Sequence, residues 1–215
     1  MKKIVLSQDE VDNLVVVERS VARPTLFKVG INDVGFQVAA DRKPIWQYSL
    51  WCRVLERAFC QKLKTDRPTY KDVTCCDEWL SFANFLGWCN KEVDYKGKPV
   101  GMALDKDIVV KGNKIYSPEA CSFVPQDVNK LLTDSGATRG EWPVGVNINK
   151  EYGRYQARLR QHGCRTHLGY YDTPEEAFLA YKVAKEAQIK AVANQYKHVL
   201  KPAVYESLMN WEIEP

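Results

Sequence analysis

Apolar residues recur every three or four positions in two stretches of the first half of the chain, and this spacing predicts two helices. The first helix is expected over 44–63 and the second over 76–91, CDEWLSFANFLGWCNK. Their inner faces are rich in aromatic side chains, which favours a packed core over a ligand-binding box. These aromatic residues are Trp46, Trp51, Trp79, Phe82, Phe85 and Trp88.

The second half has a different pattern, because apolar and polar residues alternate with a period of two. This alternation predicts strands over 144–149, 154–161 and 165–170, and a sheet with one apolar and one polar face. Thr173, Pro174 and Glu176 then form the signature of a helix start with a capping box. The small residues that follow, with one tyrosine, predict a narrow stripe that packs closely on the apolar face. This stripe consists of Ala177, Ala180, Tyr181, Ala184, Ala187 and Ala191.

The fold class is therefore α+β, in several parts. Residues 1–40 carry β-branched runs and a turn signal, which predict an N-terminal arm or short strands. A short helix is expected over 126–132, and the segment 133–143, rich in Gly, Ser, Thr and Pro, predicts a linker. The expected domains are the arm at 1–40, a first domain at 41–135, a second at 144–200 and a C-terminal helix or tail at 201–215, anchored by Trp211.

Charge singles out the second domain. The whole chain has a formal net charge of +4. Between residues 144 and 171 five basic residues face one acid, so this segment accounts for the whole net charge. The basic residues are Lys150, Arg154, Arg158, Arg160 and Arg165, and the acid is Glu151. A basic island in an otherwise neutral chain is typical of a surface that binds a polyanion.

The segments GVNI, GRYQARLR and HLGYYDTPEEAFLAY resemble the DNA-binding domain of plant ethylene-response factors, over about 50 residues. Domains of this kind also occur in phage and homing-endonuclease proteins, and they read double-stranded DNA with the three-stranded sheet. The resemblance implies that the reading side chains are Asn147, Asn149, Tyr152, Arg158, Arg160, Arg165 and His167, and the polar face adds Arg154. The chain departs from the plant domains at four of these positions. Asn147 and Asn149 stand in place of arginines, Arg158 in place of a glutamate and His167 in place of a tryptophan.

A second resemblance concerns the middle of the chain. The pieces LDK, KGN, SPEAC and SFVP, within 104–125, follow the order of the HNH nuclease motif. The resemblance implies a ββα domain in which Asp105 is the first metal ligand and Asn113 is a mainly structural asparagine. Lys106 stands at the position of the catalytic histidine, and Ala120 stands at that of the last asparagine. Phage proteins commonly join such a nuclease domain to a DNA-binding module.

The chemistry of this segment leaves three interpretations open. In the first, the HNH-like fold remains and catalysis is lost. In the second, Asp105, Asp107 and Glu119 hold Mg²⁺ or another divalent cation, and Lys106 stabilises charge during DNA cleavage. In a regular strand Asp105 and Asp107 would share one face, so both could reach one ion. In the third, DIVVKGNKIYS is an ordinary hairpin with solvated acids.

The seven cysteines do not form CxxC pairs. Their irregular spacing favours buried free thiols in a reducing cytoplasm, that of a bacterial host if the gene is phage-borne, over a zinc site. No apolar run is long enough to cross a membrane. The sequence thus predicts a two-part, phage-type protein that binds double-stranded DNA and resembles an HNH endonuclease. The alternative is an inactive regulatory protein, a repressor or an anti-defence factor, that binds an acidic partner or RNA. Both leave room for a homodimer and for a host protein partner.

Overall fold

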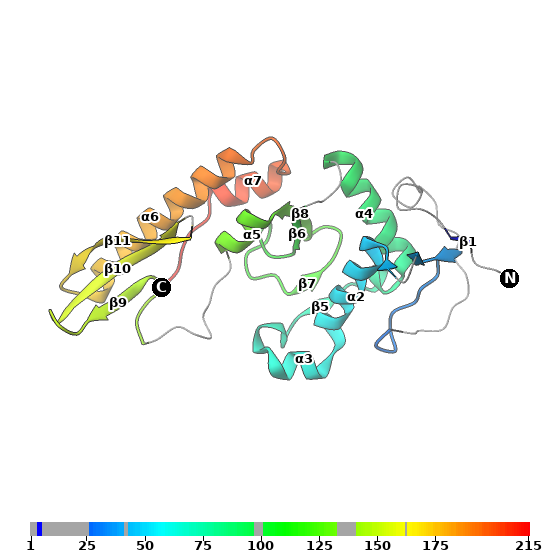
Figure 1. Ribbon diagram of the computed structural model, residues 1–215, viewed down its shortest axis with the longest axis horizontal. Helices are drawn as coiled ribbons and strands as arrows, with labels where there is room; N and C mark the ends of the chain where they lie inside the picture. Colours follow the sequence, from blue (N-terminus) through cyan, green and yellow to red (C-terminus); the bar gives the residue numbers. More distant parts are fainter. Residues whose placement is uncertain (1–3, 6–25, 41–42, 97–100, 133–140, 162) are drawn as a thin grey trace. The chain divides into compact units, whose positions relative to one another are not determined.

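The computed structural model describes residues 4–5, 26–40, 43–96, 101–132, 141–161 and 163–215 (Figure 1). The chain has an α+β architecture, as the sequence predicts. Its internal contacts divide it into two compact units, residues 1–123 and 124–215. Most of the N-terminal arm and of the expected linker, residues 6–25 and 133–140, lies outside the described residues.

Helices α2 (Trp46–Phe59) and α4 (Phe82–Lys96) form the centre of the first unit, and α3 (Gln61–Asp66) follows α2. The predicted helix over 44–63 is interrupted at Cys60, whose backbone is extended. The second predicted helix begins later than expected, because Asp77–Leu80 form a 3-10 turn. The carboxylate of Asp33 accepts hydrogen bonds from the Ser81 hydroxyl (2.7 Å) and the Ala83 amide (2.9 Å). The Ser81 hydroxyl also accepts from the Asn84 amide at 3.2 Å, so Ser81 and Asp33 together supply partners to the first turn of α4.

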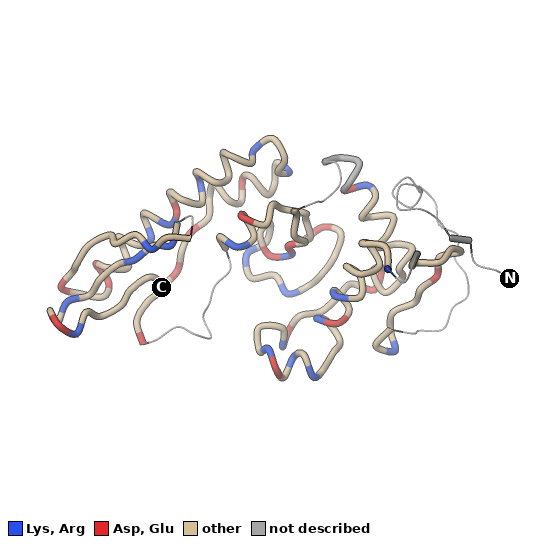
Figure 2. The backbone as a smooth tube through the Cα atoms, in the orientation of Figure 1, with Lys and Arg blue, Asp and Glu red and all other residues tan. Residues whose placement is uncertain are grey.

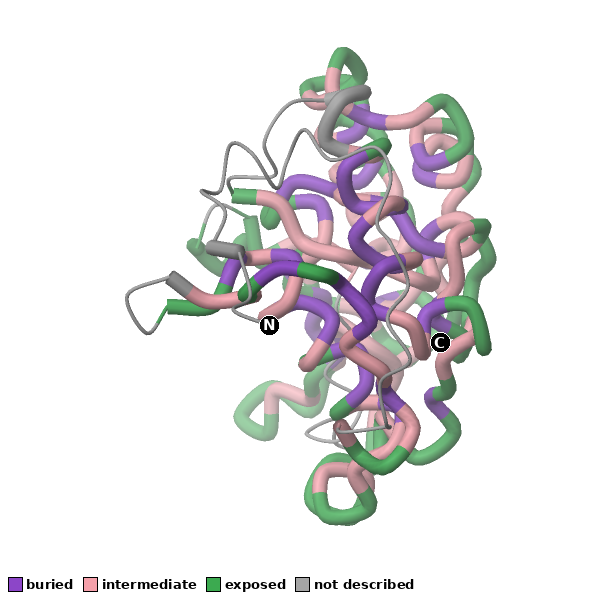
Figure 3. The backbone as a smooth tube through the Cα atoms, turned by 90° about the vertical axis from the view of Figure 1, so that its right-hand side faces the viewer, coloured by how far each residue is buried: buried purple, intermediate pink, exposed green. Residues whose placement is uncertain are grey.

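The aromatic residues of these helices pack against one another, as predicted. Trp51, Trp79, Phe82 and Phe85 are fully buried, and the Trp79 ring lies 4.7 Å from that of Trp88 and 4.9 Å from that of Phe85. The Trp51 indole N–H donates to the carbonyl of Trp79 at 2.7 Å. Buried and exposed stretches alternate along the backbone of the helices (Figure 3). The aromatic stripe is therefore a core and leaves no open box for a ligand.

The strands of the first unit are short. In the N-terminal segment β1 (Ile4–Val5) pairs with β2 (Phe36–Gln37), and β3 (Ala39–Ala40) pairs with β4 (Lys43–Pro44). After the 3-10 turn Pro68–Tyr70, β5 (Thr74–Cys75) runs parallel to β7 (Ile115–Tyr116), and β6 (Met102–Asp105) pairs with β8 (Ser122–Pro125). The interpretation of residues 107–117 as an ordinary hairpin is therefore wrong, because β6 and β7 pair with other strands and the chain between them is a loop.

Helix α5 (Gln126–Leu132) forms where the sequence predicts it, but it belongs to the second unit. It packs against α6 (Pro174–Gln195), and the Tyr196 hydroxyl, just beyond α6, donates to the Asp127 carboxylate at 3.0 Å. The division between the units consequently falls at 123/124, before the expected linker at 133–143.

The second unit contains the predicted three-stranded antiparallel sheet. Its strands are β9 (Val146–Asn149), β10 (Arg154–Gln161) and β11 (Cys164–Tyr171), with β10 in the centre. Residue 162, in the turn between β10 and β11, lies outside the described residues. Helix α6 covers one face of all three strands. A small core of Val146, Ala157, Leu159, Ala177 and Tyr181 joins the helix to the sheet.

Helix α6 begins as the sequence predicts. The Thr173 side chain accepts from the Glu176 amide, and the Glu176 carboxylate accepts from the Thr173 amide. Close packing requires glycine at 145, where φ is +78° and an added Cβ would overlap the Tyr181 ring. The predicted stripe is only partly correct, because Ala187 and Ala191 are exposed. The helix also packs against α5 and α7, and its later residues Ile189 and Ala193 are fully buried.

Helix α7 (Pro202–Met209) packs on α6, with Val204 and Leu208 fully buried, so the C-terminal helix is confirmed. The expected anchor Trp211 is only half-buried, whereas Ile213 packs against the core between sheet and helix. In the part of the chain that the structure describes, no helix is both long enough and apolar enough to cross a membrane.

Candidate functional site

The polar face of the sheet, opposite α6, brings together side chains from all three strands. Pairing places Arg158 opposite His167, and Arg160 opposite Arg165. Gln156 lies between Asn147 on one side and Tyr170 on the other. We call this surface the basic face; it consists of Asn147, Asn149, Arg154, Gln156, Arg158, Arg160, Arg165, His167 and Tyr170. The cations of β10 and β11 follow one another along the hairpin in Figure 2.

Three arginines of the basic face have no internal counter-charge. Arg158, Arg160 and Arg165 are exposed, and none of them makes an ion pair with another described residue. Arg160 and Arg165 are direct cross-strand neighbours, and like charges in that position repel each other. An anionic ligand would remove this repulsion.

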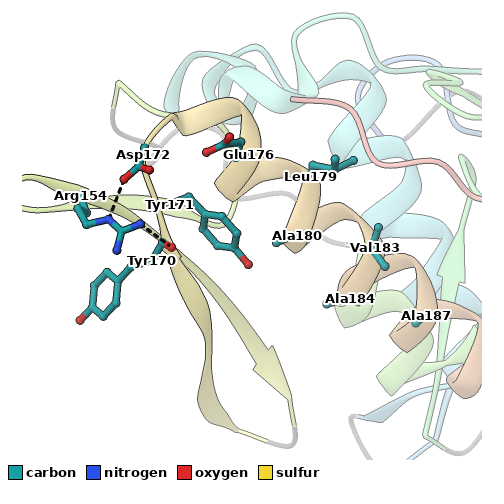
Figure 4. Close-up of a pocket in the computed structure, with 10 residues that line it drawn as sticks. All are labelled: Arg154, Tyr170, Tyr171, Asp172, Glu176, Leu179, Ala180, Val183, Ala184 and Ala187. Carbon is teal, nitrogen blue, oxygen red and sulfur yellow. Dashed lines mark hydrogen bonds and ion pairs between the residues drawn. The ribbon is translucent and has the colours of Figure 1, made fainter.

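Arg154 differs from these three. Its Nε donates to the Asp172 carboxylate at 2.9 Å, and its terminal nitrogen donates to the Tyr170 carbonyl at 3.4 Å (Figure 4). The pair is exposed, so its contribution to stability is small. The ion pair has two consequences for Arg154. Asp172 holds the arginine side chain in place at the start of β10, and it offsets the positive charge.

A bulge in β11 places two aromatic rings on the basic face. The register shifts between Ala157 and Arg158, so that Leu168 has no partner on β10. His167 and Tyr170 are three residues apart and would point to opposite faces of a regular strand. With the extra residue they share one face, and their rings lie 4.6 Å apart.

Tyr170 was missed by the sequence prediction, and Gly169 is the signal that could have found it. A glycine inside a strand pattern indicates a bulge. Gly169 has a φ of +147°, in a region that other residues rarely adopt. Its neighbours on the face are Tyr152, whose ring lies 6.1 Å from that of Tyr170, and Asn149, whose amide donates to the Tyr170 hydroxyl at 3.3 Å.

The two asparagines of β9 have different surroundings. The side-chain oxygen of Asn149 accepts from the amides of Glu151 and Tyr152, at 3.0 and 3.3 Å, and so closes the turn between β9 and β10. Asn147 is exposed on β9, an edge strand of the sheet. Asn149 therefore positions the turn and Tyr170, whereas Asn147 has a free amide to offer a ligand.

Gln156 is buried in the centre of the basic face, and its Oε1 has no hydrogen-bond partner among the described residues. A buried acceptor without a partner costs about 1–3 kcal/mol. The Gln156 side chain therefore lowers the stability of the protein through an unsatisfied buried acceptor.

The second candidate site, the loop 105–115, is held together by its own polar side chains. The Asn113 amide donates to the carbonyls of Lys106 (2.7 Å) and Ile115 (2.8 Å), and its oxygen accepts from the Ile115 amide. The Lys106 ammonium donates to the Asp107 carboxylate and to the Asn113 carbonyl, both at 3.0 Å. These two bonds tie the Lys106 side chain to the loop and so stabilise the loop.

The two aspartates do not share a strand face, and that part of the prediction is wrong. Strand β6 ends at Asp105, whose carboxylate accepts from the amides of Asp107 and Ile108 at 2.9 Å each. The chain therefore turns at this point. Burial and the neighbouring charge of Asp107 raise the pKa of Asp105 to about 6.

The residues predicted to hold a divalent cation fit it poorly. Within the described ranges, no three Asp, Glu, His or Cys side chains are placed to bind one ion. Glu119 is exposed in the turn 118–120, and the carboxylates of Asp105 and Asp107 are already engaged by amides and by Lys106. The histidines at 162, 167 and 198 all belong to the second unit.

All seven cysteines are free thiols. Cys75 and Cys121 lie next to the loop, and burial raises the pKa of both, that of Cys121 to about 12. Thiols of this kind are protonated at neutral pH and are poor nucleophiles. They are part of the packing around Tyr116, which accepts a hydrogen bond from Arg57 at 3.0 Å.

Comparisons of this chain with protein-family models, with curated proteins and with solved structures gave no match. A function therefore has to be argued from the two sites themselves.

Proposed function

We propose that the chain binds double-stranded DNA through the basic face of its second unit. The observation that carries this proposal is a set of exposed arginines on two adjacent strands, Arg158, Arg160 and Arg165, that form no ion pair with any residue the structure describes. Lys150 extends the positive charge to the turn between β9 and β10. Four cations on one surface attract the phosphates of a duplex.

The shape of the surface favours DNA over an RNA duplex. Neighbouring strands lie about 5 Å apart, so the two-stranded hairpin β10–β11 fits a major groove about 12 Å wide. The major groove of an RNA duplex is too narrow and deep for side chains to read. The positions of the face also coincide with those through which the ethylene-response-factor domains read DNA.

Each side chain then has a role that its surroundings support. Unpaired arginines contact phosphates or the acceptor edge of guanine, and the free amide of Asn147 suits the edge of adenine. Arg154, held by Asp172, suits a phosphate at the edge of the site. The rings of Tyr152, His167 and Tyr170 provide apolar contact with sugars and thymine methyl groups.

Salt dependence tests this proposal. Binding of the full chain to a labelled mixed-sequence duplex is measured by fluorescence anisotropy at several salt concentrations. Four phosphate contacts predict a log–log slope of about −3.6. Equal affinity for an RNA duplex, or competition by polyglutamate as strong as by DNA, would favour the RNA or acidic-protein alternative. No binding to the DNA duplex at low salt would refute the proposal.

For the first unit we propose a scaffolding role for the loop 105–115 and no hydrolysis. Its support is the engagement of Asp105, Lys106 and Asn113 in bonds within the loop. A protein whose second unit binds DNA and whose first unit does not cut it would act by occupying its DNA site, as a repressor or an accessory factor does. Supercoiled plasmid incubated with the protein and Mg²⁺ or Mn²⁺ should stay intact. Cleavage that Asp105→Ala abolishes would instead restore the interpretation as a rebuilt nuclease.

A further inference from the structure

Helix α6 carries an outward-facing apolar stripe that the DNA-binding proposal does not use. Leu179 is 60% exposed and Val183 is 62% exposed, although both are large apolar residues in the most regular helix of the chain. Ala187 continues the stripe one turn later and is also exposed. The spacing of four residues between them keeps all three on one side of the helix.

This stripe is separate from the face of α6 that holds the sheet. Ala177 and Tyr181 pack on the strands, and Lys182 and Glu186 bind the C-terminal tail through the backbone of Ile213. An open groove of about 720 Å³ follows the stripe between α6 and the end of β11. Figure 4 shows Leu179 and Val183 on the helix, with Tyr171 and Asp172 across the groove.

The charges at the two ends of the stripe are opposite. Glu176 lies one turn before Leu179, and Lys190 lies one turn after Ala187. Both are exposed, and Lys190 makes no ion pair with another described residue. The stripe therefore reads acid, leucine, valine, alanine, base.

Two such stripes match each other when they run antiparallel, because each acid then meets a base and each leucine meets an alanine. We infer that the stripe binds the same stripe of a second copy of this chain, with the two α6 helices antiparallel and Val183 on the two-fold axis. In this arrangement Leu179 of each copy faces the small Ala187 of the other, and Glu176 faces Lys190. The antiparallel helix dipoles also attract each other.

The size of the stripe sets the expected strength. From Glu176 to Lys190 the helix is about 21 Å long. A stable dimer buries about 800 Å² on each partner, and one helix face with three apolar side chains offers less than that. We therefore expect a reversible dimer with a Kd in the micromolar range, and no permanent one.

The inferred dimer has a consequence for DNA, which rests on the proposed function. Because α6 covers the apolar face of the sheet, pairing through the outer side of α6 leaves each basic face directed away from the partner. Two separate duplex segments could then be held by one dimer. Dimerisation itself is measured without DNA, so the two proposals fail independently.

Sedimentation of the full chain across the micromolar range tests the dimer. Wild type should change from monomer to dimer as its concentration rises, and Val183→Glu should weaken the association at least 100-fold, because two carboxylates would meet on the axis. Val110→Glu is the matched control, since Val110 is an exposed valine of the first unit (57%) and should leave the dimer unchanged. A chain that stays monomeric throughout, or a dimer that Val183→Glu leaves intact, overturns the inference.

Charge reversal and cross-linking test the orientation. Lys190→Glu and Glu176→Gln should each weaken the dimer, and circular dichroism should show that the helix persists, because glutamine at 176 can still complete the capping box with Thr173. In a Cys164→Ser background, Val183→Cys should form a cross-linked dimer under mild oxidation with diamide. Leu179→Cys should not, because in an antiparallel pair the two residues 179 lie about 12 Å apart along the axis. Equal cross-linking at both positions would indicate a parallel pair and contradict the inferred arrangement.

Discussion

The loop 105–115 and the basic face contain the same kinds of side chain but use them in opposite ways. In the loop, Lys106, Asp107 and Asn113 find their partners within about ten residues of the chain. On the basic face, Arg158, Arg160 and Arg165 have no such partners. A polar residue that is satisfied internally stabilises the fold, whereas one that is exposed and repelled by its neighbours is available to a ligand. The sequence motif alone does not distinguish these two cases.

The largest expected effect comes from removing the free charges. The triple substitution Arg158→Ala, Arg160→Ala and Arg165→Ala should abolish most of the binding to the mixed-sequence duplex, because it removes three of the four proposed phosphate contacts. The salt slope should fall by about 2.7. Removing three exposed cations of the first unit, Lys62, Arg67 and Lys71, is the matched control. If both triple variants lose the same affinity, the comparison between the regions fails.

Asn113→Ala should have the next largest effect, and on stability. It removes three side-chain hydrogen bonds, which should cost about 2–3 kcal/mol of unfolding free energy. DNA affinity should stay unchanged. Denaturant unfolding measures the loss, and Asn194→Ala, which removes one exposed bond to Tyr205, should cost much less. A normal stability for Asn113→Ala would mean that the loop is not held by this side chain.

The pH dependence of stability tests Asp105. Its pKa in the folded protein is about 6, above the ordinary value of 3.8, so the folded state binds its proton more tightly than the unfolded state. Stability should therefore fall as the pH rises from about 4 to about 6, by roughly 2–3 kcal/mol, and then stay level. Asp105→Asn keeps an acceptor for the two amides and should abolish this fall. If the variant keeps the same fall in stability with pH, Asp105 is not the group that causes it.

The smallest expected effect is at Gln156. Gln156→Met replaces a buried acceptor without a partner by an apolar side chain of similar length, and should leave stability unchanged or raise it by about 1 kcal/mol. Thermal unfolding measures the change. A loss of more than about 1 kcal/mol would show that Gln156 has a partner in the free protein.

The sequence predicted the parts of this chain that depend on local pattern. Alternation along 154–161 and the capping signature at Thr173 predicted the sheet and helix of the second unit, because both patterns are set by neighbours in the chain. The start of α4 has a local signal that the prediction missed, the Ser81 cap, but its second partner Asp33 is 48 residues away and no local pattern reveals it.

The candidate sites were predictable to a similar degree. The arginines of the basic face followed from alternation, whereas Tyr170 required the bulge at Leu168. In the loop, the order of the motif predicted the structural role of Asn113. The end of β6 at Asp105 was missed although its signal is local, because an aspartate that accepts from the amides two and three residues later forms a turn.

The bulge in β11 also constrains how this surface can change over evolutionary time. Substitutions at Arg165, His167 or Tyr170 alter one contact each and leave the core intact. Loss of Leu168 would remove the bulge and leave His167 and Tyr170 two residues apart in a regular strand, so both would stay on the basic face. The core beneath α6 would lose the packing of the Leu168 side chain. We therefore expect relatives of this chain to vary the side chains of the basic face, and to tolerate a change in the length of β11 at the bulge and nowhere else in the strand.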